Sequence, residues 1–252
     1  MQSLANSLEG STLSTISTPL RVLFTCFLGT IGIGYLTALF YLFLVDVDPH
    51  RKMGMGVAEG ISMKYHGQQG NTRLEASLRG SMADRLGPGD KQQIAQWVQG
   101  GATAGDFEKV KPIFEKNCIA CHNPKSGLPV PPLTTFDEVR KVTEVDTGPS
   151  FGQLARVSHV HLFGISIIFL LTGGIFALSE ISGTLRLAII GMPYLAIWAD
   201  IGSWWITKYQ PLFAYVVLIG GGLMGLALAA QILISLWEMW FRNPSAAPVA
   251  RG

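Results

Sequence analysis

Charged residues are scarce in this chain. Asp, Glu, Lys and Arg make up 14% of its 252 residues, whereas about 25% is usual in soluble globular proteins. The few charges are also concentrated, because residues 46–156 contain 13 of the 17 acidic and 14 of the 19 basic residues. This distribution excludes a single soluble domain, a disordered chain, a coiled coil and a nucleic-acid binder with a basic face.

Cysteine is rare as well, with 3 in the whole sequence. A structural zinc site needs a second Cys/His pair at similar spacing, and the sequence has none. No stretch alternates between apolar and polar residues over a useful length, so we expect no β-sheet. The remaining class is an all-α membrane protein with one water-exposed domain.

Four apolar runs are long enough to cross a hydrocarbon core about 30 Å thick, which requires roughly 20 residues. They cover residues 21–45, 157–181, 187–206 and 212–241. The first run is longer than the apolar core of a signal peptide and no small-residue cleavage site ends it, so we interpret it as an uncleaved membrane helix.

The segment between the first two runs, residues 46–156, is the part that can fold in water. Helical patterns fill it, and it is large enough to bury a modest core. The predicted organisation is therefore an N-terminus and first membrane helix (1–45), a helical domain (46–156), three further membrane helices (157–241) and a tail (242–252).

The strongest chemical signal is Cys118-Ile119-Ala120-Cys121-His122, a CxxCH motif. This spacing is typical of c-type haem attachment, in which both thiols add to the haem vinyl groups and the adjacent His binds iron. A thioredoxin-like redox pair requires a βαβ context, which the helical surroundings do not offer. A plain disulfide leaves His122 without a role. We predict one covalent haem c.

Residues from about 90 to 145 resemble a class I c-type cytochrome domain. KVKPIFEKNCIACHN is similar to the helix and haem motif of that family, and Pro131-Pro132-Leu133 resembles the loop that braces the proximal His. The resemblance implies that Cys118, Cys121, Pro132 and Leu133 contact the haem, with His122 as the proximal iron ligand.

The sequence departs from that family at the second axial ligand, which is usually a Met after the motif. No Met occurs between His122 and Met192, which lies in an apolar run. His159 and His161, at the start of the second membrane helix, are the downstream candidates, and ionisable residues at membrane depth are generally functional. About 200° separates positions i and i+2 on a helix, so only one of them can face one iron. The upstream alternatives are Met53, Met55, Met63, His66 and Met82, and an open site is the third possibility.

The cytochrome resemblance implies a location. Haem c is attached on the outer face of the bacterial plasma membrane, so we expect a multi-pass inner-membrane protein with a periplasmic haem domain and both termini inside. Arg21, Arg186, Arg242 and Arg251 then lie on the cytoplasmic side, in agreement with the positive-inside rule.

The leading functional hypothesis is a membrane-bound cytochrome that transfers single electrons, more an electron-transfer subunit than a catalytic one. Three membrane helices after the domain exceed what an anchor needs, so we expect other membrane redox subunits as partners, within a respiratory or other oxidoreductase complex. Quinol and a soluble periplasmic carrier are the alternative electron donors or acceptors. The competing functions are a haem enzyme or gas-binding subunit with an open iron site, and a mainly structural assembly subunit.

Two acidic residues lie near the ends of the predicted membrane helices. Glu180 and Glu238 are expected to extend their carboxylates along the protein surface to water, as long charged side chains do near an interface.

Overall fold

The computed structural model describes residues 11–52, 54–68, 70–128 and 130–243. Across these ranges the chain is helical and forms no strand, apart from one isolated antiparallel bridge between Thr72 and Val145. The predicted all-α architecture is confirmed. Contacts between residues divide the chain into two units. The first is Val45–Pro149, and the second combines the residues through Leu44 with those from Ser150 onward.

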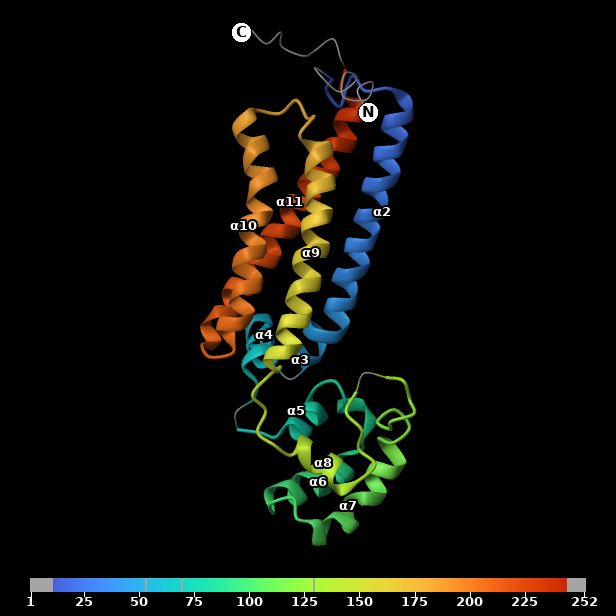
Figure 1. Cartoon of the computed structure of the whole chain (residues 1–252), viewed down its shortest axis with the longest axis vertical. Coiled ribbons are helices and arrows are strands. Elements are labelled where there is room, and N and C mark those ends of the chain that lie inside the picture. Colours follow the sequence, from blue (N-terminus) through green and yellow to red (C-terminus); the bar gives the residue numbers. More distant parts are fainter. Residues whose placement is uncertain (1–10, 53, 69, 129, 244–252) are drawn as a thin grey trace. The chain divides into compact units, whose positions relative to one another are not determined.

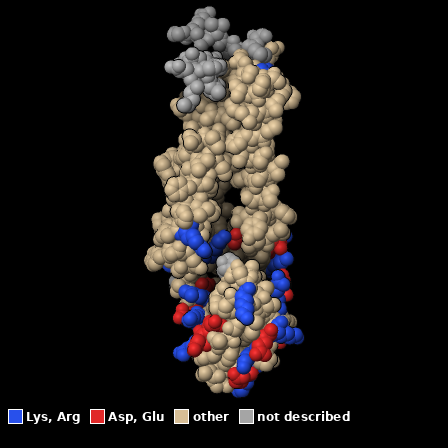
Figure 2. Space-filling view, turned by 45° about the vertical axis from the view of Figure 1, so that its right-hand side comes forward, with Lys and Arg blue, Asp and Glu red and all other residues tan. Residues whose placement is uncertain are grey.

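The second of these units contains four helices that are long and apolar enough to cross a membrane, as predicted. Figure 1 shows them as long ribbons running side by side. They are α2 (Thr18–Leu42), α9 (Phe151–Phe176), α10 (Gly183–Thr207) and α11 (Ala214–Phe241), the last preceded by a short 3₁₀ turn, η3 (Pro211–Phe213). Most of the surface of these helices is uncharged in Figure 2.

The helix boundaries differ from the apolar runs by several residues, for example at the end of the first helix and at the start of α9. The first apolar helix continues beyond α2 through a π-helical turn, η1 (Phe43–Val47), and α3 (Asp48–Lys52). α9 begins at Phe151, six residues before its apolar run. The reason is capping: the Ser150 side chain accepts a hydrogen bond from the Gln153 N–H at 3.3 Å, and the Gln153 side chain accepts one from the Ser150 N–H at 2.8 Å. A reciprocal cap of this kind fixes the first turn whatever the hydropathy of the residues that follow.

A buried glutamine joins three of the membrane helices. Gln231 of α11 is fully buried; its Oε1 accepts a hydrogen bond from the Thr172 hydroxyl of α9, and its Nε2 donates one to the Ile189 carbonyl of α10 at 3.0 Å. Hydrogen bonds between helices compensate for the absence of a hydrophobic driving force inside lipid. α2 contacts this group at Gly225, where a side chain larger than hydrogen would collide with the Tyr35 hydroxyl.

An ion cluster lies at one end of the four helices, and it corrects the expectation for Glu180 and Glu238. Glu238 is fully buried, and the Glu180 side chain is only 9% exposed, so neither extends freely into water. Arg242 pairs with Glu180 at 2.9 Å and with Glu238 at 3.0 Å. The Glu180 N–H also donates to both Glu238 oxygens, and the Ser14 hydroxyl donates to the Glu180 carboxylate.

The N-terminal segment covers this cluster. Leu13, Ser14 and Ile16 are at most 5% exposed, and the Leu13 N–H donates to the Leu178 carbonyl at 3.0 Å. The segment limits the access of water to the carboxylates, and pairing with Arg242 replaces much of their hydration.

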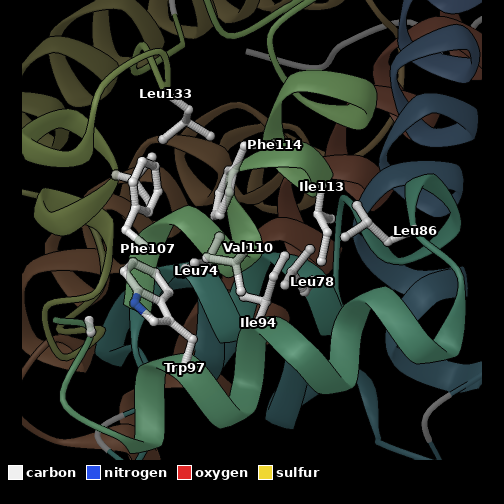
Figure 3. Packing of buried hydrophobic residues seen from close by; sticks show 12 residues of the cluster. Leu74, Leu78, Leu86, Ile94, Trp97, Phe107, Val110, Ile113, Phe114 and Leu133 are labelled. Carbon is white, nitrogen blue, oxygen red and sulfur yellow. The ribbon is translucent and has the colours of Figure 1, made fainter. Parts of the chain in front are cut away.

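The Val45–Pro149 unit is built from short helices. After α3 they are α4 (Val57–His66), α5 (Arg73–Arg79), the 3₁₀ turn η2 (Ala83–Arg85), α6 (Pro88–Gln99), α7 (Ala104–Asn117) and α8 (Phe136–Val142). Aromatic and aliphatic side chains from α5, α6, α7 and α8 form one core, which Figure 3 shows around Phe107, Val110 and Phe114. Trp97 packs against Phe107 with ring centroids 5.6 Å apart, so α6 and α7 are held together.

The ion cluster yields a stability prediction. Arg242→Met leaves two enclosed carboxylates without a cation and should destabilise the protein by about 3 kcal/mol, as when one partner of a buried pair is removed. Thermal unfolding in detergent should show a lower Tm. Arg156→Met, which removes an exposed arginine of α9, should leave the Tm within error, and an equal effect of both substitutions would contradict the role of the cluster.

Candidate functional site

The CxxCH motif forms a tight turn at the end of α7. Cys118 follows the last helical residue, and its N–H donates to the Phe114 carbonyl at 2.8 Å. The N–H groups of Cys121 and His122 both donate to the Cys118 carbonyl, at 3.1 and 2.9 Å. α7 itself is anchored because Val110, Ile113 and Phe114 are buried in the core. The hydrophobic side of α7 therefore fixes where the motif lies.

The imidazole of His122 is oriented by the loop that follows. Its Nδ1 lies 2.8 Å from the Pro131 carbonyl oxygen, and the Leu133 N–H donates to the His122 carbonyl at 2.9 Å. A carbonyl can only accept, so Nδ1 carries a proton, and in the neutral imidazole Nε2 then keeps its lone pair. A hydrogen bond from the other ring nitrogen is what commonly orients a metal-binding histidine. Leu133 is buried in the core and anchors this loop.

The two motif thiols lie in different surroundings. Cys118 is half-buried and packs against the core, and burial raises the pKa of its thiol. Cys121 is exposed, and neither thiol is in a disulfide. Two free thiols beside an imidazole with an available Nε2 fit a covalently attached haem, whose iron takes one ligand from the motif.

No group of three or more His, Cys, Asp or Glu side chains that could hold a metal ion occurs within the residues that the structure describes. A haem does not need such a group, because the porphyrin supplies the other donors to its iron.

The upstream candidates for the second axial ligand differ in location and burial in the structure. Met53 lies outside the described residues. Met55 and Met63 are partly buried, the latter within α4, and His66 ends that helix. Met82 packs against the same hydrophobic core as Cys118. The assignment of any of them as the distal ligand stays a prediction.

His159 and His161 both lie in α9, which belongs to the unit that does not contain His122. Each is exposed, and each Nδ1 contacts the carbonyl four residues earlier, at 3.2 Å from Ala155 for His159 and 2.9 Å from Val157 for His161. The Nε2 atom is therefore the acceptor in both rings. The His161 ring contacts Trp204 edge to face, with centroids 5.2 Å apart. Their assignment as a distal ligand stays a prediction.

The structure also reveals a groove between α9 and α10 that the sequence did not indicate. Its volume is about 460 Å³, and its lining includes Ser158, His159, Trp198 and Trp205. Nearby, Asp200 is buried and accepts a hydrogen bond from the Trp204 indole at 3.3 Å. The sequence placed His159 and His161 at the start of a membrane helix, but the contact between two helices makes the groove.

A comparison with protein families covers the membrane helices. The model of the Aq_1264_TM family, described as a transmembrane helical domain, matches residues 142–246, which include α9, α10 and α11. This chain is a multi-pass membrane protein. The match does not extend to residues 118–122, so it carries no information about the CxxCH turn. No curated protein and no solved structure matches the chain.

The difference between the two thiols can be measured in the full-length membrane protein before haem is attached, with Cys26 replaced by Ala. A raised pKa lowers the thiolate fraction at neutral pH, and burial slows access, so Cys118 should be alkylated several-fold more slowly than Cys121. Mass spectrometry after timed exposure to iodoacetamide gives both rates. Equal rates would contradict the packing of Cys118 against the core.

Proposed function

We propose that the chain is a membrane-bound c-type cytochrome that transfers single electrons as a subunit of a larger oxidoreductase complex. In this proposal Cys118 and Cys121 hold one haem c covalently and His122 is its proximal ligand. The observation that carries the proposal is the turn at residues 118–122. Two free thiols lie there together with an imidazole whose Nδ1 is hydrogen-bonded to the Pro131 carbonyl. Haem bound there supplies a one-electron couple.

The residues around the motif have defined tasks in this proposal. The Pro131 carbonyl holds the His122 ring in one tautomer and one orientation, so that Nε2 remains available to iron. Leu133 and Phe114 provide apolar surroundings next to the motif, and burial in apolar surroundings is one of the ways a protein sets a haem potential. Pro132 is part of the same bracing loop.

The side chains that could serve as a second axial ligand to the haem iron favour an electron-transfer role over a haem enzyme. Electron-transfer haems keep two axial ligands, whereas an enzyme or gas-binding haem leaves one position open. His159, His161 and Met82 are all available by residue type, so the proposal includes a second ligand. Three membrane helices follow the motif unit, and their exposed apolar surfaces, such as Leu195 and Leu226, suit either lipid or other membrane subunits.

We place the Val45–Pro149 unit on the periplasmic side of a bacterial inner membrane. The cytochrome resemblance carries this placement, because haem c is attached on the outer face of the plasma membrane. Arg21, Arg186 and Arg242 then lie on the cytoplasmic side, since all three bond to groups at one end of the four-helix unit, within residues 14–16, 179–180 and 238. Arginine at that end agrees with the positive-inside rule, although Arg51, Lys52, Arg156 and Lys208 lie at the opposite ends of the helices.

Haem attachment can be tested directly. The full-length protein, produced in a bacterial host that attaches haem c, should retain haem through denaturing electrophoresis and stain for it. Replacing Cys118 and Cys121 together by Ala should abolish the stain, because no thioether bond can then form. Cys26→Ala is the matched control and should stain like the wild type. A colourless wild-type band would refute the proposal.

The second axial ligand is tested by single substitutions, with His159→Ala, His161→Ala and Met82→Leu compared in the haem-loaded protein. We expect bis-histidine coordination, so one of the two histidine variants should become high-spin while Met82→Leu stays low-spin. The oxidised wild type should lack the near-infrared band of methionine-ligated haem. That band, together with a high-spin Met82→Leu protein, would assign the ligand to Met82 instead.

Carbon monoxide separates the competing functions in the same preparation. A six-coordinate electron-transfer haem should leave the reduced spectrum unchanged under carbon monoxide. Rapid formation of a carbon monoxide complex by the wild type would favour the haem enzyme or gas-binding subunit.

A further inference from the structure

The groove between α9 and α10 has the properties of a binding site for a small amphipathic molecule. It lies entirely within the four-helix unit, near the start of α9 and the end of α10. Its volume of about 460 Å³ falls within the range of roughly 300–1,000 Å³ that small-molecule sites occupy. Both of its walls are membrane helices, so a ligand that reaches it from the side arrives through lipid.

A glycine keeps the groove open. Gly202 lies on its α10 wall, and a Cβ placed on Gly202 would have no atom within 4 Å. The first carbon of a larger residue at position 202 would therefore project into open space beside the groove without colliding with the protein.

The polar groups in the groove favour a hydroxyl donor. The His159 Nδ1–H donates to the Ala155 carbonyl at 3.2 Å, so Nε2 can accept a hydrogen bond. Next to it, the Ser158 hydroxyl oxygen accepts a hydrogen bond from the Trp205 indole at 3.1 Å, which fixes the Trp205 ring at the groove. A ligand that donates a hydroxyl proton to His159 would complete this arrangement.

The apolar lining favours a flat ring. Trp205 and Trp198 both line the groove, and Trp198 remains 63% exposed although it is a large aromatic residue. Planar aromatic ligands pack well against indole faces. Among the described residues that line the groove, none is Lys or Arg. The Lys208 ammonium lies over the Phe151 ring, which stacks on Trp205 of the lining, so a bound phospholipid is a competing occupant that the test must distinguish.

We propose that this groove binds the ring of a quinol, with a ring hydroxyl donating to Nε2 of His159 and the ring packed against Trp198 and Trp205. The choice of ligand rests on the proposed electron-transfer function, since a quinol is a lipid-soluble electron carrier with a planar ring and hydroxyl donors. The proposal concerns binding and assigns no electron transfer to the groove. It predicts a preference for the reduced form, because a quinone offers only carbonyl acceptors to Nε2.

The test uses the full-length protein, purified with its haem and placed in phosphatidylcholine nanodiscs, and measures equilibrium binding of decylubiquinol and decylubiquinone. The wild type should bind decylubiquinol more tightly than decylubiquinone. Gly202→Leu should weaken decylubiquinol binding at least about tenfold by occupying the groove. Gly191→Leu is the matched control, since Gly191 is also in α10 with open space at its Cβ but does not line the groove.

His159 is tested in the same assay. His159→Leu should weaken decylubiquinol binding by up to about tenfold, the effect of losing one hydrogen bond, and His159→Gln should retain more affinity because it keeps an acceptor. The haem spectrum of each variant is recorded in parallel. His159→Leu should remain low-spin, and a high-spin spectrum would overturn the assignment of His159 to the groove by making it an iron ligand.

Two further outcomes would overturn the proposal. One is equal decylubiquinol binding by the wild type and Gly202→Leu, and the other is co-purification of phospholipid in the groove that decylubiquinol does not displace. If the quinol-binding proposal is wrong, the protein stains for haem but does not bind decylubiquinol. If the cytochrome proposal is wrong, the protein carries no haem whether or not it binds decylubiquinol, so the two results are distinguishable.

Discussion

The absence of water inside a lipid bilayer is the constraint on which most of this structure depends. Backbone polar groups in hydrocarbon must find partners within the protein, and long helices provide those partners locally. Side-chain polar groups face the same requirement. Gln231 meets it by bonding to α9 and α10 from α11, and Glu238 meets it by bonding to Arg242 and to the Glu180 N–H. The Gln231 bonds cross between helices, so they also hold α9, α10 and α11 together as neighbours.

The unit at Val45–Pro149 follows a different rule, because it can exchange hydrogen bonds with water and is held together by its apolar core. That core has a direct consequence for the proposed chemistry. α7 is anchored by Val110 and Phe114, and the bracing loop by Leu133, so the turn at Cys118–His122 is supported from both sides. A single carbonyl, from Pro131, then selects the tautomer of His122. Packing thus orients the imidazole that the proposal assigns to the haem iron.

The two histidines of α9 lie in different surroundings. His159 lines the groove with Trp198 and Trp205, whereas His161 contacts Trp204 edge to face. Both rings direct Nδ1 to their own helix and keep Nε2 as an acceptor. In the proposed scheme, the imidazole beside the groove serves a lipid-soluble ligand and the other remains a candidate for the haem iron. The family match covers the helix that carries both residues but not the CxxCH turn, so the membrane part and the proposed haem part are supported by separate observations.

Hydropathy and residue spacing determined the class of this protein. Uncharged runs of sufficient length predicted four membrane helices, and the concentration of charge between the first two predicted a separate water-exposed segment. The CxxCH spacing predicted the proposed cofactor, because thioether attachment requires residues that are close along the chain. Only the tertiary structure decided the pairing of Glu180 and Glu238 with Arg242, the shared core of Met82 and Cys118, and the groove beside Gly202. Each of these features depends on residues that come from different parts of the chain. Sequence periodicity indicates which face of a helix is apolar, but it does not indicate which neighbouring helix covers that face.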